Sequence, residues 1–428
     1  MPDAKTTLKS ELSELIDANR SEIIDLLRRF LRIRSVNPPG DTREAADFVR
    51  SILDRFGVPH RTVALDETMP NIVGRWDAAG SGRHLVLNGH LDVFPVTNEA
   101  LWSADVRDGK IYGRGASDMK TGTLASVLAY CYLYQKRQQL AGALTLTVVS
   151  DEQSGGRFGT RYLFEHMPDE ISGDCCLNGE PSGLGTLRFT EKATLRFSLS
   201  SRSKGGHGGY PHHAPNPIER ICKLTARIYA DYHLKLATLP ADVDAILTSP
   251  ETIAAADANL GTGAGDIARR ITVNIGIIKG GQKATQIPTD CIAHLDIRIP
   301  IGSDRDAIQR QIDSLAAEHG CEMRVNWDHS YPASMTDPFG EMAGILRANI
   351  RQLLGSDAPP VSSLGGTDTR YWRWRGIPAV ICGPSPLSMG TDEEHVTIEE
   401  AIAVIKLHAL CAADYLDPAR QGEAQPPA

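Results

Sequence analysis

The stretch VVSDEQSGG, residues 148–156, joins the end of an apolar run to an acidic turn. Its two valines close a predicted buried strand, and Asp151, Glu152 and Gln153 follow before a pair of glycines that lets the chain turn sharply. In α/β proteins, ligands bind at the ends of the strands. We therefore expect this acidic turn to lie at a strand end and to face a cleft.

Three short apolar runs, HLVLNGH, LTLTVVS and DCCLNGE, indicate the fold class of the first part of the chain. A helical stretch near 119–136 separates the first two runs. Two amphipathic helices precede them, one near 12–33 with a break at Asn19 and one near 43–56 with Gly57 as its C-cap. This alternation predicts an α/β fold, with a mixed sheet between two layers of helices.

The pattern changes in the middle of the chain to that of a second domain. Strands and helices follow there in the order βαββαβ, which is typical of the split unit of ferredoxin-like domains. Within it, residues 240–268 are rich in Ala, Gly, Asp and Thr and are predicted to form a flexible excursion. We expect a ferredoxin-like domain, 191–330, inserted into a larger domain formed by 1–190 and 331–416, with a disordered tail at 417–428.

The composition of the 428 residues is that of an ordinary globular protein, with 41% apolar and 23% charged residues. A formal net charge of −8 argues against nucleic acid or an anionic membrane as partner. No apolar run approaches the ~18 residues of a membrane span, and the N-terminal residues lack the pattern of a secretory signal. The eight cysteines are scattered, which is typical of reduced thiols. We expect a soluble cytoplasmic α/β protein.

Histidine and carboxylate side chains recur at predicted strand ends and glycine-rich turns, namely at His90, Asp92, Asp118, Glu152 and Glu180. Any one of them alone is typical of a surface or capping residue. Several buried carboxylates together need partners, and a divalent cation is the usual one. His90 and Asp92 are two residues apart and point to the same side of an extended chain, so Asp92 can hold the second nitrogen of the His90 ring.

Eight motifs, in one order along the chain, resemble those of a known family. They are NGHLDVFP, GRGASDMKTG, SDEQSGG, GEPSG, GGHGGYP, NIGIIKGG, LDIRIP and GGTDTR. The family is that of the co-catalytic metallopeptidases, which includes acetylornithine deacetylase, succinyl-diaminopimelate desuccinylase, aminoacylase and glutamate-releasing carboxypeptidases. The resemblance extends from about residue 22 to about residue 412. It implies a metal-binding catalytic domain and an inserted lid domain through which subunits form a homo-oligomer, usually a dimer.

Carried over residue by residue, the resemblance implies a metal site and a base. His90 and Glu180 match the ligands of one metal, and Asp118 matches a carboxylate that bridges two metals. Glu152 matches the general base, which takes a proton from the attacking water and returns it to the leaving nitrogen. With Glu152 and His207, we count Asp92 among the catalytic residues, because it can hold the His90 ring.

Residues of the predicted lid and of the later catalytic segment match groups that bind the substrate. His207 matches a histidine that reaches the active site of a partner subunit and donates a hydrogen bond to the developing oxyanion. Asn274 and Arg298 match substrate-holding lid residues, and the guanidinium of Arg298 suits a carboxylate. Arg370, in GGTDTR, is a further candidate for substrate binding.

The sequence departs from the family pattern at both private ligands of the second metal. Gln153 stands where the family has a glutamate, and an amide is a much poorer ligand than a carboxylate. The expected C-terminal histidine falls on Met389 or Gly390, and we expect the nearby His395 not to replace it. We therefore predict one divalent transition metal ion per subunit, held by His90, Asp118 and Glu180, without a sharp choice among Mn²⁺, Fe²⁺, Co²⁺ and Zn²⁺.

These expectations define a metal-dependent hydrolase that cleaves a C–N bond of a small carboxylate-bearing substrate. Loss of the second metal is similar to the situation in 5-nitroanthranilate aminohydrolase, so our main expectation is a hydrolytic deaminase that releases ammonia. The alternative is an amidohydrolase or dipeptidase that acts on N-acyl amino acids. A third alternative is a protein that binds a small molecule without turnover, although a binding protein has no need of a base at Glu152.

Overall fold

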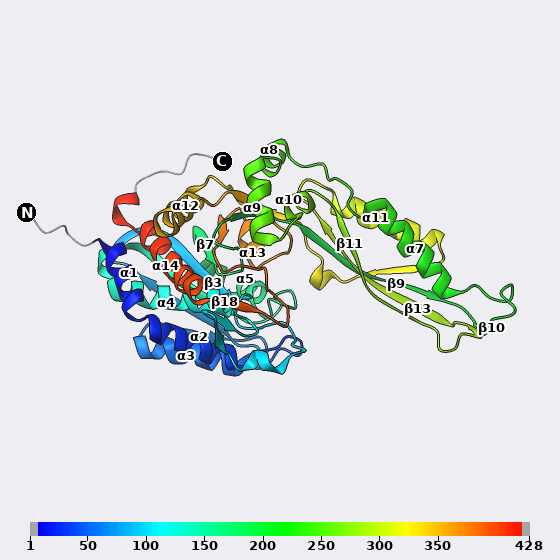
Figure 1. Ribbon diagram of the computed structural model, residues 1–428, viewed down its shortest axis with the longest axis horizontal. Coiled ribbons are helices and arrows are strands. Elements are labelled where there is room, and N and C mark those ends of the chain that lie inside the picture. Colours follow the sequence, from blue (N-terminus) through cyan, green and yellow to red (C-terminus); the bar gives the residue numbers. More distant parts are fainter. Residues whose placement is uncertain (1–6, 422–428) are drawn as a thin grey trace, which may run out of the picture.

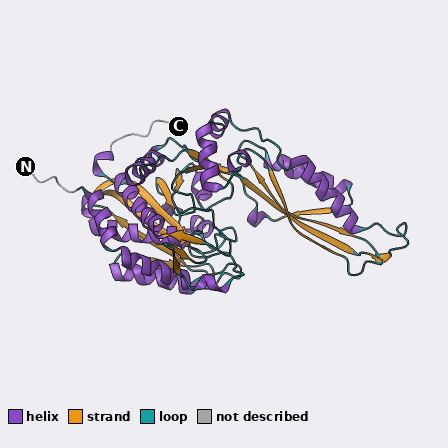
Figure 2. Ribbon diagram, in the orientation of Figure 1, coloured by secondary structure: helices purple, strands orange, loops and turns teal. Residues whose placement is uncertain are grey.

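The computed structural model describes residues 7–421 of the chain. A broad α/β domain forms one end of the molecule, and a narrow arm extends from it (Figure 1). Helices surround the strands of the broad domain, whereas the helices of the arm run along one side of its sheet (Figure 2). Among these residues, no helix combines the length and the apolar character that a membrane span requires.

A six-stranded mixed sheet forms the middle layer of the broad domain, in the order β1-β2-β6-β3-β7-β17. Strand β3 runs parallel to β6 and β7, and β17 runs parallel to β7, whereas β2 pairs with β1 and β6 antiparallel. Strand β6 is buried along its whole length, as is typical of a strand covered on both faces. The strands span Arg61–Val63 (β1), Asn71–Asp77 (β2), Gly80–His90 (β3), Ala141–Val149 (β6), Cys175–Asn178 (β7) and Ala379–Ile381 (β17).

Helices cover both faces of this sheet. On β3, Leu85 and Leu87 belong to one hydrophobic core, whereas Val86 belongs to another on the opposite face. Successive side chains of a strand point to opposite faces, so the two cores define the three layers predicted from the sequence. One face carries Leu8–Ala18 (α1), Arg20–Arg32 (α2), Arg43–Phe56 (α3), Lys120–Lys136 (α4), Glu341–Leu354 (α12) and Ile398–Tyr415 (α14), and the other carries Thr160–His166 (α5), Pro168–Ile171 (α6) and Thr369–Arg373 (α13).

The helix boundaries predicted near the start of the chain are confirmed. Asn19 separates α1 from α2, and its side-chain amide donates to the Leu15 carbonyl oxygen at 2.8 Å. Gly57 ends α3 in the left-handed conformation, with φ of 63°, which glycine adopts without steric cost.

Four antiparallel strands form the sheet of the arm in the order β11-β13-β9-β14. Helices α7 and α11 bury Ile221 and Ile312 against Leu195 and Leu295 of this sheet. The order of the elements along the chain is the predicted ferredoxin-like βαββαβ, and we call residues 193–325 without the intervening helices α8–α10 the lid. Its elements are Ala193–Arg202 (β9), Pro217–Tyr232 (α7), Thr272–Gly280 (β11), Asp290–Ile299 (β13), Arg305–Glu318 (α11) and Glu322–Val325 (β14).

The prediction that residues 240–268 form a flexible excursion is wrong. They form three short helices, Ala241–Leu247 (α8), Pro250–Leu260 (α9) and Ala264–Ile267 (α10), and Ser249 caps α9 by accepting from the Thr252 N–H. Val243 and Ala256 pack against Phe189 and Val361 of a small sheet beside the lid. Because the buried residues of these helices are few and small, their composition resembles that of a loop. The small sheet contains Leu187–Glu191 (β8), Ser334–Met335 (β15) and Pro360–Ser363 (β16).

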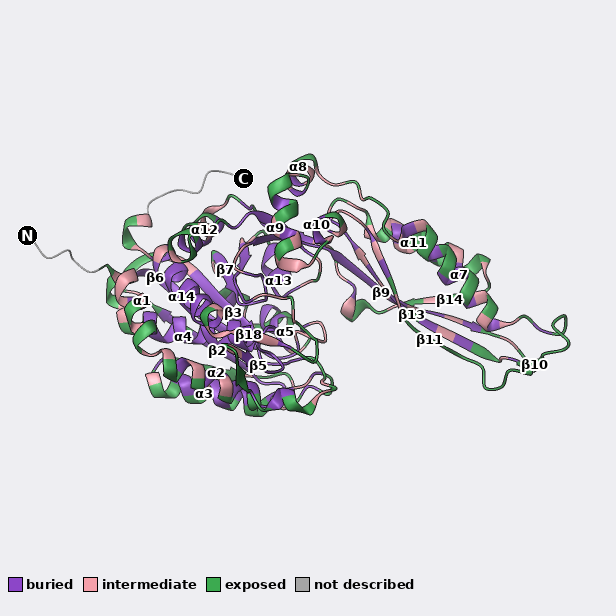
Figure 3. Cartoon of the chain, in the orientation of Figure 1, coloured by how far each residue is buried: buried purple, intermediate pink, exposed green. Residues whose placement is uncertain are grey.

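The prediction of a disordered tail is wrong for its first residues. Pro418–Arg420 form a short 3₁₀ helix, and the Gln421 side-chain oxygen accepts from the Arg83 N–H at 2.7 Å. The remainder of the predicted tail, 422–428, lies outside the described residues. Burial is densest in the broad domain, while the tip of the lid around Gly206–His207 (β10) is exposed (Figure 3).

Candidate metal centre and active site

Three neighbouring strands end at the same edge of the central sheet and deliver functional side chains there. His90 is the last residue of β3, Glu180 follows β7 by two residues, and Glu152 follows β6 by three. Since β6, β3 and β7 are adjacent and parallel, their carboxyl ends meet. Asp118 joins them from the loop that precedes α4.

His90, Asp118 and Glu180 each place one ligand atom within 4.8 Å of the other two. His90 Nε2 lies 3.1 Å from Asp118 Oδ1 and 3.5 Å from Glu180 Oε1, and all three side chains are buried. Among the described residues, Glu180 Oε1 has no hydrogen-bond partner. A buried carboxylate oxygen without a donor is suited to a cation, and this nitrogen–oxygen donor set fits a divalent transition metal. The residues present therefore fit one such ion.

The His90 ring is held in the tautomer that ligation by Nε2 requires. Its Nδ1 lies 2.8 Å from the Asp92 backbone carbonyl oxygen, which can only accept, and 3.4 Å from the Asp92 carboxylate. The carboxylate instead accepts from the backbone N–H groups of Glu152, at 3.2 Å, and Gln153, at 3.0 Å. Asp92 thus orients the ring mainly by its backbone, and its side chain fixes the loop that carries the expected base.

Glu394 fixes the loop of Asp118, a role that the sequence alone did not indicate. One carboxylate oxygen of Glu394 accepts from the backbone N–H groups of Gly115, Ser117 and Asp118 at 3.0–3.1 Å. Its other oxygen pairs with the buried guanidinium of Arg114. Glu394 thus holds the backbone of the Asp118 loop from a distant part of the chain.

Of the two positions that the family resemblance assigned to ligands of a second metal, one carries the amide of Gln153 and the other falls on Met389 or Gly390. Gln153 Nε2 donates to Asp118 Oδ2 at 3.1 Å, and Met389 lines the same cavity as Asp118. His395 does not join them, because its ring packs against Tyr112 with centroids 5.1 Å apart and its Nδ1 lies 2.7 Å from the Glu393 carbonyl oxygen. Within residues 7–421, the triad is the one group of three or more potential metal ligands.

Glu152 lies beside the triad without belonging to it. Burial, and next the charge of Glu180, raise the pKa of Glu152 well above its ordinary range. Arg370 Nη1 lies 3.4 Å from Glu152 Oε1 and balances part of its charge. Asp151 adopts φ of 71° and accepts from the Phe158 N–H at 3.0 Å, so it shapes the turn that carries Glu152.

A cavity of about 260 Å³ contains this chemistry and is lined by residues of both the broad domain and the lid. Asp118, Glu152 and Glu180 form one part of its wall. Four arginines line it as well, of which sequence analysis identified Arg298 and Arg370 and missed Arg188 and Arg196. Tyr331 was also missed, and its ring stacks on the Arg370 guanidinium at 4.7 Å. These additional residues lie on ordinary alternating strands or loops and carry no motif.

Two predicted substrate-side residues lie outside this cavity in the single chain. His207 is exposed on β10, at the end of the lid far from the broad domain (Figure 1). Asn274 lines a separate cavity of about 420 Å³ on the lid, with Arg196 and Asp296. The expectation that His207 acts in the site of a partner subunit stays a prediction.

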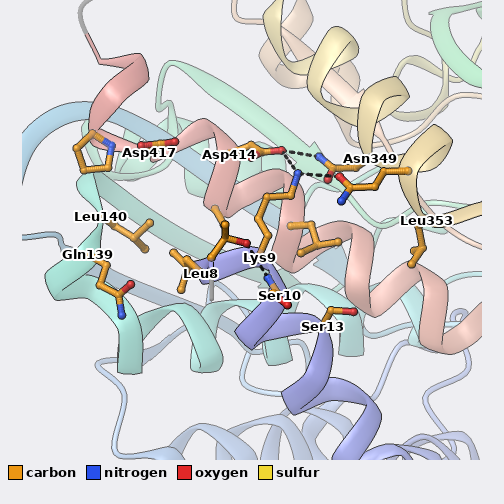
Figure 4. A pocket seen from close by; sticks show the side chains of 15 residues that line it. Leu8, Lys9, Ser10, Ser13, Gln139, Leu140, Asn349, Leu353, Asp414 and Asp417 are labelled. Atoms are coloured by element: carbon orange, nitrogen blue, oxygen red, sulfur yellow. Dashed lines mark hydrogen bonds and ion pairs between the residues drawn. The ribbon is translucent and has the colours of Figure 1, made fainter. Parts of the chain in front are cut away.

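A larger cavity, of about 770 Å³, lies between α1, α12 and α14 and lacks this chemistry (Figure 4). Its Lys9 ammonium pairs with the Asp414 carboxylate at 2.8 Å, and Asn349 Nδ2 donates to the same oxygen at 2.8 Å. Its main charges are therefore paired with one another, and we place the active site in the smaller cavity, which Asp118, Glu152 and Glu180 line.

Comparison with known proteins agrees with this geometry. The model of peptidase family M20/M25/M40 matches residues 86–414. Succinyl-diaminopimelate desuccinylase of Xanthomonas euvesicatoria is 28% identical over 407 residues, which cover 91% of this chain and 97% of the relative. The protein of that name from Cereibacter sphaeroides is 28% identical over 409 residues, covering 92% and 98%.

Solved structures share the fold over nearly the whole chain. The M20 family metallo-carboxypeptidase Sso-CP2 from Sulfolobus solfataricus has a TM-score of 0.78 at 18% identity, covering 93% of this chain and 99% of that one. The dipeptidase Dug1p from Saccharomyces cerevisiae has a TM-score of 0.79 at 15% identity, covering 96% and 99%. From the family match over most of its length and the triad beside Glu152, the chain belongs to peptidase family M20/M25/M40 and is a metal-dependent hydrolase.

Proposed function

We propose that this enzyme hydrolyses the amide C–N bond of a small N-acyl compound that carries a carboxylate, with one divalent metal ion per subunit. The observation that carries the proposal is the position of Glu152, which shares a cavity with the ligands Asp118 and Glu180 but is not itself part of the triad. An acid–base group beside a metal site is what amide hydrolysis requires. The names of the desuccinylase relatives support an acyl substrate.

His90, Asp118 and Glu180 would hold the cation, which would supply Lewis acidity to the scissile carbonyl. Glu152 takes a proton from the attacking water, and its raised pKa suits it to hold that proton. It then returns the proton to the nitrogen that leaves. Arg370, stacked between Tyr331 and Tyr371, keeps the Glu152 carboxylate directed toward the cavity.

The lid supplies positive charge for the substrate carboxylate. Arg298 donates to both oxygens of Asp296, at 2.8 and 2.9 Å, and Arg196 donates to one of them at 2.9 Å. Two guanidinium groups therefore share one carboxylate, which leaves a net positive charge at the wall of the cavity. Such a pair suits the planar carboxylate of a small substrate.

Hydrolytic deamination of an aminoarene is a second candidate, and the contact of Gln153 with Asp118 favours it. That contact engages an Asp118 oxygen with an amide, which supports a site with a single Lewis acid. A ring with a strong electron acceptor, such as 5-nitroanthranilate, stabilises the charge that develops on attack and has less need of a second metal.

The two candidates are separated by the product that each releases. The Mn²⁺-loaded enzyme is incubated with a panel of N-acyl amino acids, including N-succinyl compounds, and separately with 5-nitroanthranilate. Release of a free amino acid supports the amidohydrolase, whereas release of ammonia from the aminoarene supports the deaminase. If neither product forms, and the Glu152→Gln variant behaves as the wild type does, the proposal of a hydrolase for this substrate class is wrong.

We further propose that the active enzyme is a cytoplasmic homo-oligomer assembled through the lid. His207 lies at the exposed end of the lid and Asn274 on a lid strand, and neither lines the cavity of its own chain. A histidine at that position is suited to donate to an oxyanion in the site of a neighbouring subunit. The eight cysteines are all unpaired, which supports a reducing compartment.

A further inference from the structure

Arg188 is a buried arginine whose charge has no carboxylate partner. It lies on β8, is 6% exposed, and lines the cavity that contains Asp118, Glu152 and Glu180. Among residues 7–421, no carboxylate oxygen lies within 4.0 Å of its guanidinium nitrogens. A buried charge without a direct ion pair is destabilising, so it calls for a functional explanation.

The other cations of the cavity differ from Arg188 in this respect. Arg370 pairs with Glu152 at 3.4 Å, and Arg196 and Arg298 both pair with Asp296 at 2.9 Å or less. Arg188 is held by a neutral group instead, because its Nε and Nη2 donate to the Ser182 carbonyl oxygen at 3.2 and 2.9 Å. Its Nη1 has no protein acceptor among the described residues. This nitrogen is also not among the fully buried atoms that lack a hydrogen-bond partner, so it is accessible from the cavity that Arg188 lines.

The contact with Ser182 places Arg188 at a fixed position relative to the metal centre. Ser182 belongs to the turn GEPSG that also carries the ligand Glu180, two residues earlier. Burial lowers the pKa of Arg188 to about 10, while the charges of Glu180 and Glu191 oppose this, so the guanidinium is charged at neutral pH. The broad domain thus presents a fixed cation next to the metal ligands, separate from the cations of the lid.

We propose that Arg188 is an anion subsite that binds a second acidic group of the substrate, in addition to the carboxylate bound by the lid arginines. The inference rests on the proposed function and names its substrate class, which is a compact molecule with two anionic oxygen-bearing groups. The cavity of about 260 Å³ accepts only a small molecule of this kind. A guanidinium offers two parallel donors to such a group, which a lysine ammonium does not.

The test compares two probes of equal chain length, succinate and butyrate, which differ by one carboxylate. Their dissociation constants are measured by calorimetry on the full Mn²⁺-loaded chain, for the wild type, Arg188→Gln and Arg188→Lys. Arg375→Gln is the matched control, since Arg375 does not line this cavity. Metal content and thermal midpoint are recorded for each variant to establish that it is folded and loaded.

The wild type should bind succinate at least about tenfold more tightly than butyrate, which corresponds to one charge-assisted contact. The ratio of the butyrate to the succinate dissociation constant measures this preference. It should fall to about one in Arg188→Gln, take an intermediate value in Arg188→Lys and stay unchanged in Arg375→Gln. Absence of the preference in the wild type, or its persistence in folded Arg188→Gln, overturns the subsite. If Arg188→Gln does not fold, a preference for succinate in folded Arg188→Lys as large as that of the wild type overturns it. If the wild type prefers succinate and Arg188→Gln does not, but no C–N hydrolysis is found, the proposed function is contradicted and the anion subsite is still supported.

Discussion

Gln153 Nε2 donates to Asp118 Oδ2 at 3.1 Å, while Asp118 Oδ1 lies 3.1 Å from His90 Nε2. The two oxygens of one carboxylate therefore have different neighbours. One faces the remaining ligands of the triad, and the other faces an amide that stands where the family pattern has a glutamate. An Asp118 oxygen that accepts from Gln153 has less capacity to bridge to a second cation, which supports the proposal of one metal ion per subunit.

The first prediction concerns metal stoichiometry. The wild type should retain one Mn²⁺ per chain after loading and gel filtration. The double variant Gln153→Glu/Met389→His should retain two, because it restores a carboxylate and an imidazole as potential ligands. It also removes the amide that donates to Asp118 Oδ2 in the wild type. Metal content is measured by mass spectrometry, with Met389→Leu as the control that should stay at one. Two ions per wild-type chain would show that Gln153 permits a second metal.

The second prediction concerns the base. Glu152→Gln should lower kcat by roughly 10²–10⁴-fold, the usual contribution of general acid–base catalysis. Metal content should stay unchanged, since Glu152 does not belong to the triad. Glu165→Gln is the matched control, because Glu165 is exposed and pairs with Arg161 on the surface. Equal loss of metal and activity in Glu152→Gln would instead identify Glu152 as a ligand.

The third prediction concerns the metal-free protein at different pH values. Burial, and next the charge of Asp118, raise the pKa of Glu180 from 4.5 to about 7. Between these values the folded chain holds a proton that the unfolded chain has released, so the free energy of unfolding should fall as the pH rises from 4.5 to 7. Urea unfolding in a chelator measures this slope.

The control for this measurement is Glu180→Gln, whose side chain stays neutral. The free energy of unfolding of this variant should depend less on pH between 4.5 and 7. Loading the wild type with Mn²⁺ should also reduce the slope, because a cation stabilises the ionised carboxylate and displaces the proton. An identical slope in the wild type and in Glu180→Gln would show that Glu180 does not titrate in this range.

The fourth prediction concerns Glu394 and the loop that carries Asp118. Glu394→Gln removes the charge that pairs with buried Arg114, so it should destabilise the fold by about 3 kcal/mol. It should also weaken Mn²⁺ binding by roughly 10–100-fold, because the partners of metal ligands orient them. Glu399→Gln, at an exposed position on α14, is the control. Reduced stability with unchanged metal affinity would mean that the Asp118 loop is held without Glu394.

The positions of the principal site residues could be predicted from the sequence because they follow strands. His90, Glu152 and Glu180 each come at or just after a short apolar run, and adjacent parallel strands bring their carboxyl ends together. Glu394 could not be predicted in this way, since it lies 276 residues from Asp118 and contacts only backbone N–H groups there and a buried arginine.

The arginines of the cavity were missed for a different reason. Arg188 and Arg196 lie on strands whose sequences show ordinary alternation, and only the packing of the lid beside the broad domain brings them to one cavity. The helices α8–α10 were missed because they are short and bury few, small side chains. Long-range packing, rather than local pattern, determines these features.

The fifth prediction concerns His207 and assembly. If His207 completes the site of a partner subunit, His207→Ala and Glu152→Gln should each be inactive alone but should complement one another in mixed dimers. A dimer with one subunit of each kind contains one intact site, formed by Glu152 of the first and His207 of the second. Random assembly of equal amounts makes half of the dimers mixed, so activity should reach about a quarter of the wild-type value.

Activity is measured after co-expression with two different affinity tags, so that mixed dimers can be purified, and the purified mixed dimers should reach about half of the wild-type value because one of their two sites is intact. Asp118→Asn combined with Glu152→Gln is the control that should not recover, because both substitutions damage the site of their own subunit. Verified mixed dimers of His207→Ala and Glu152→Gln without activity would contradict a role for His207 in the partner's site. Full activity of His207→Ala alone would contradict any catalytic role, and the exposed position of His207 at the tip of the lid would then need another explanation.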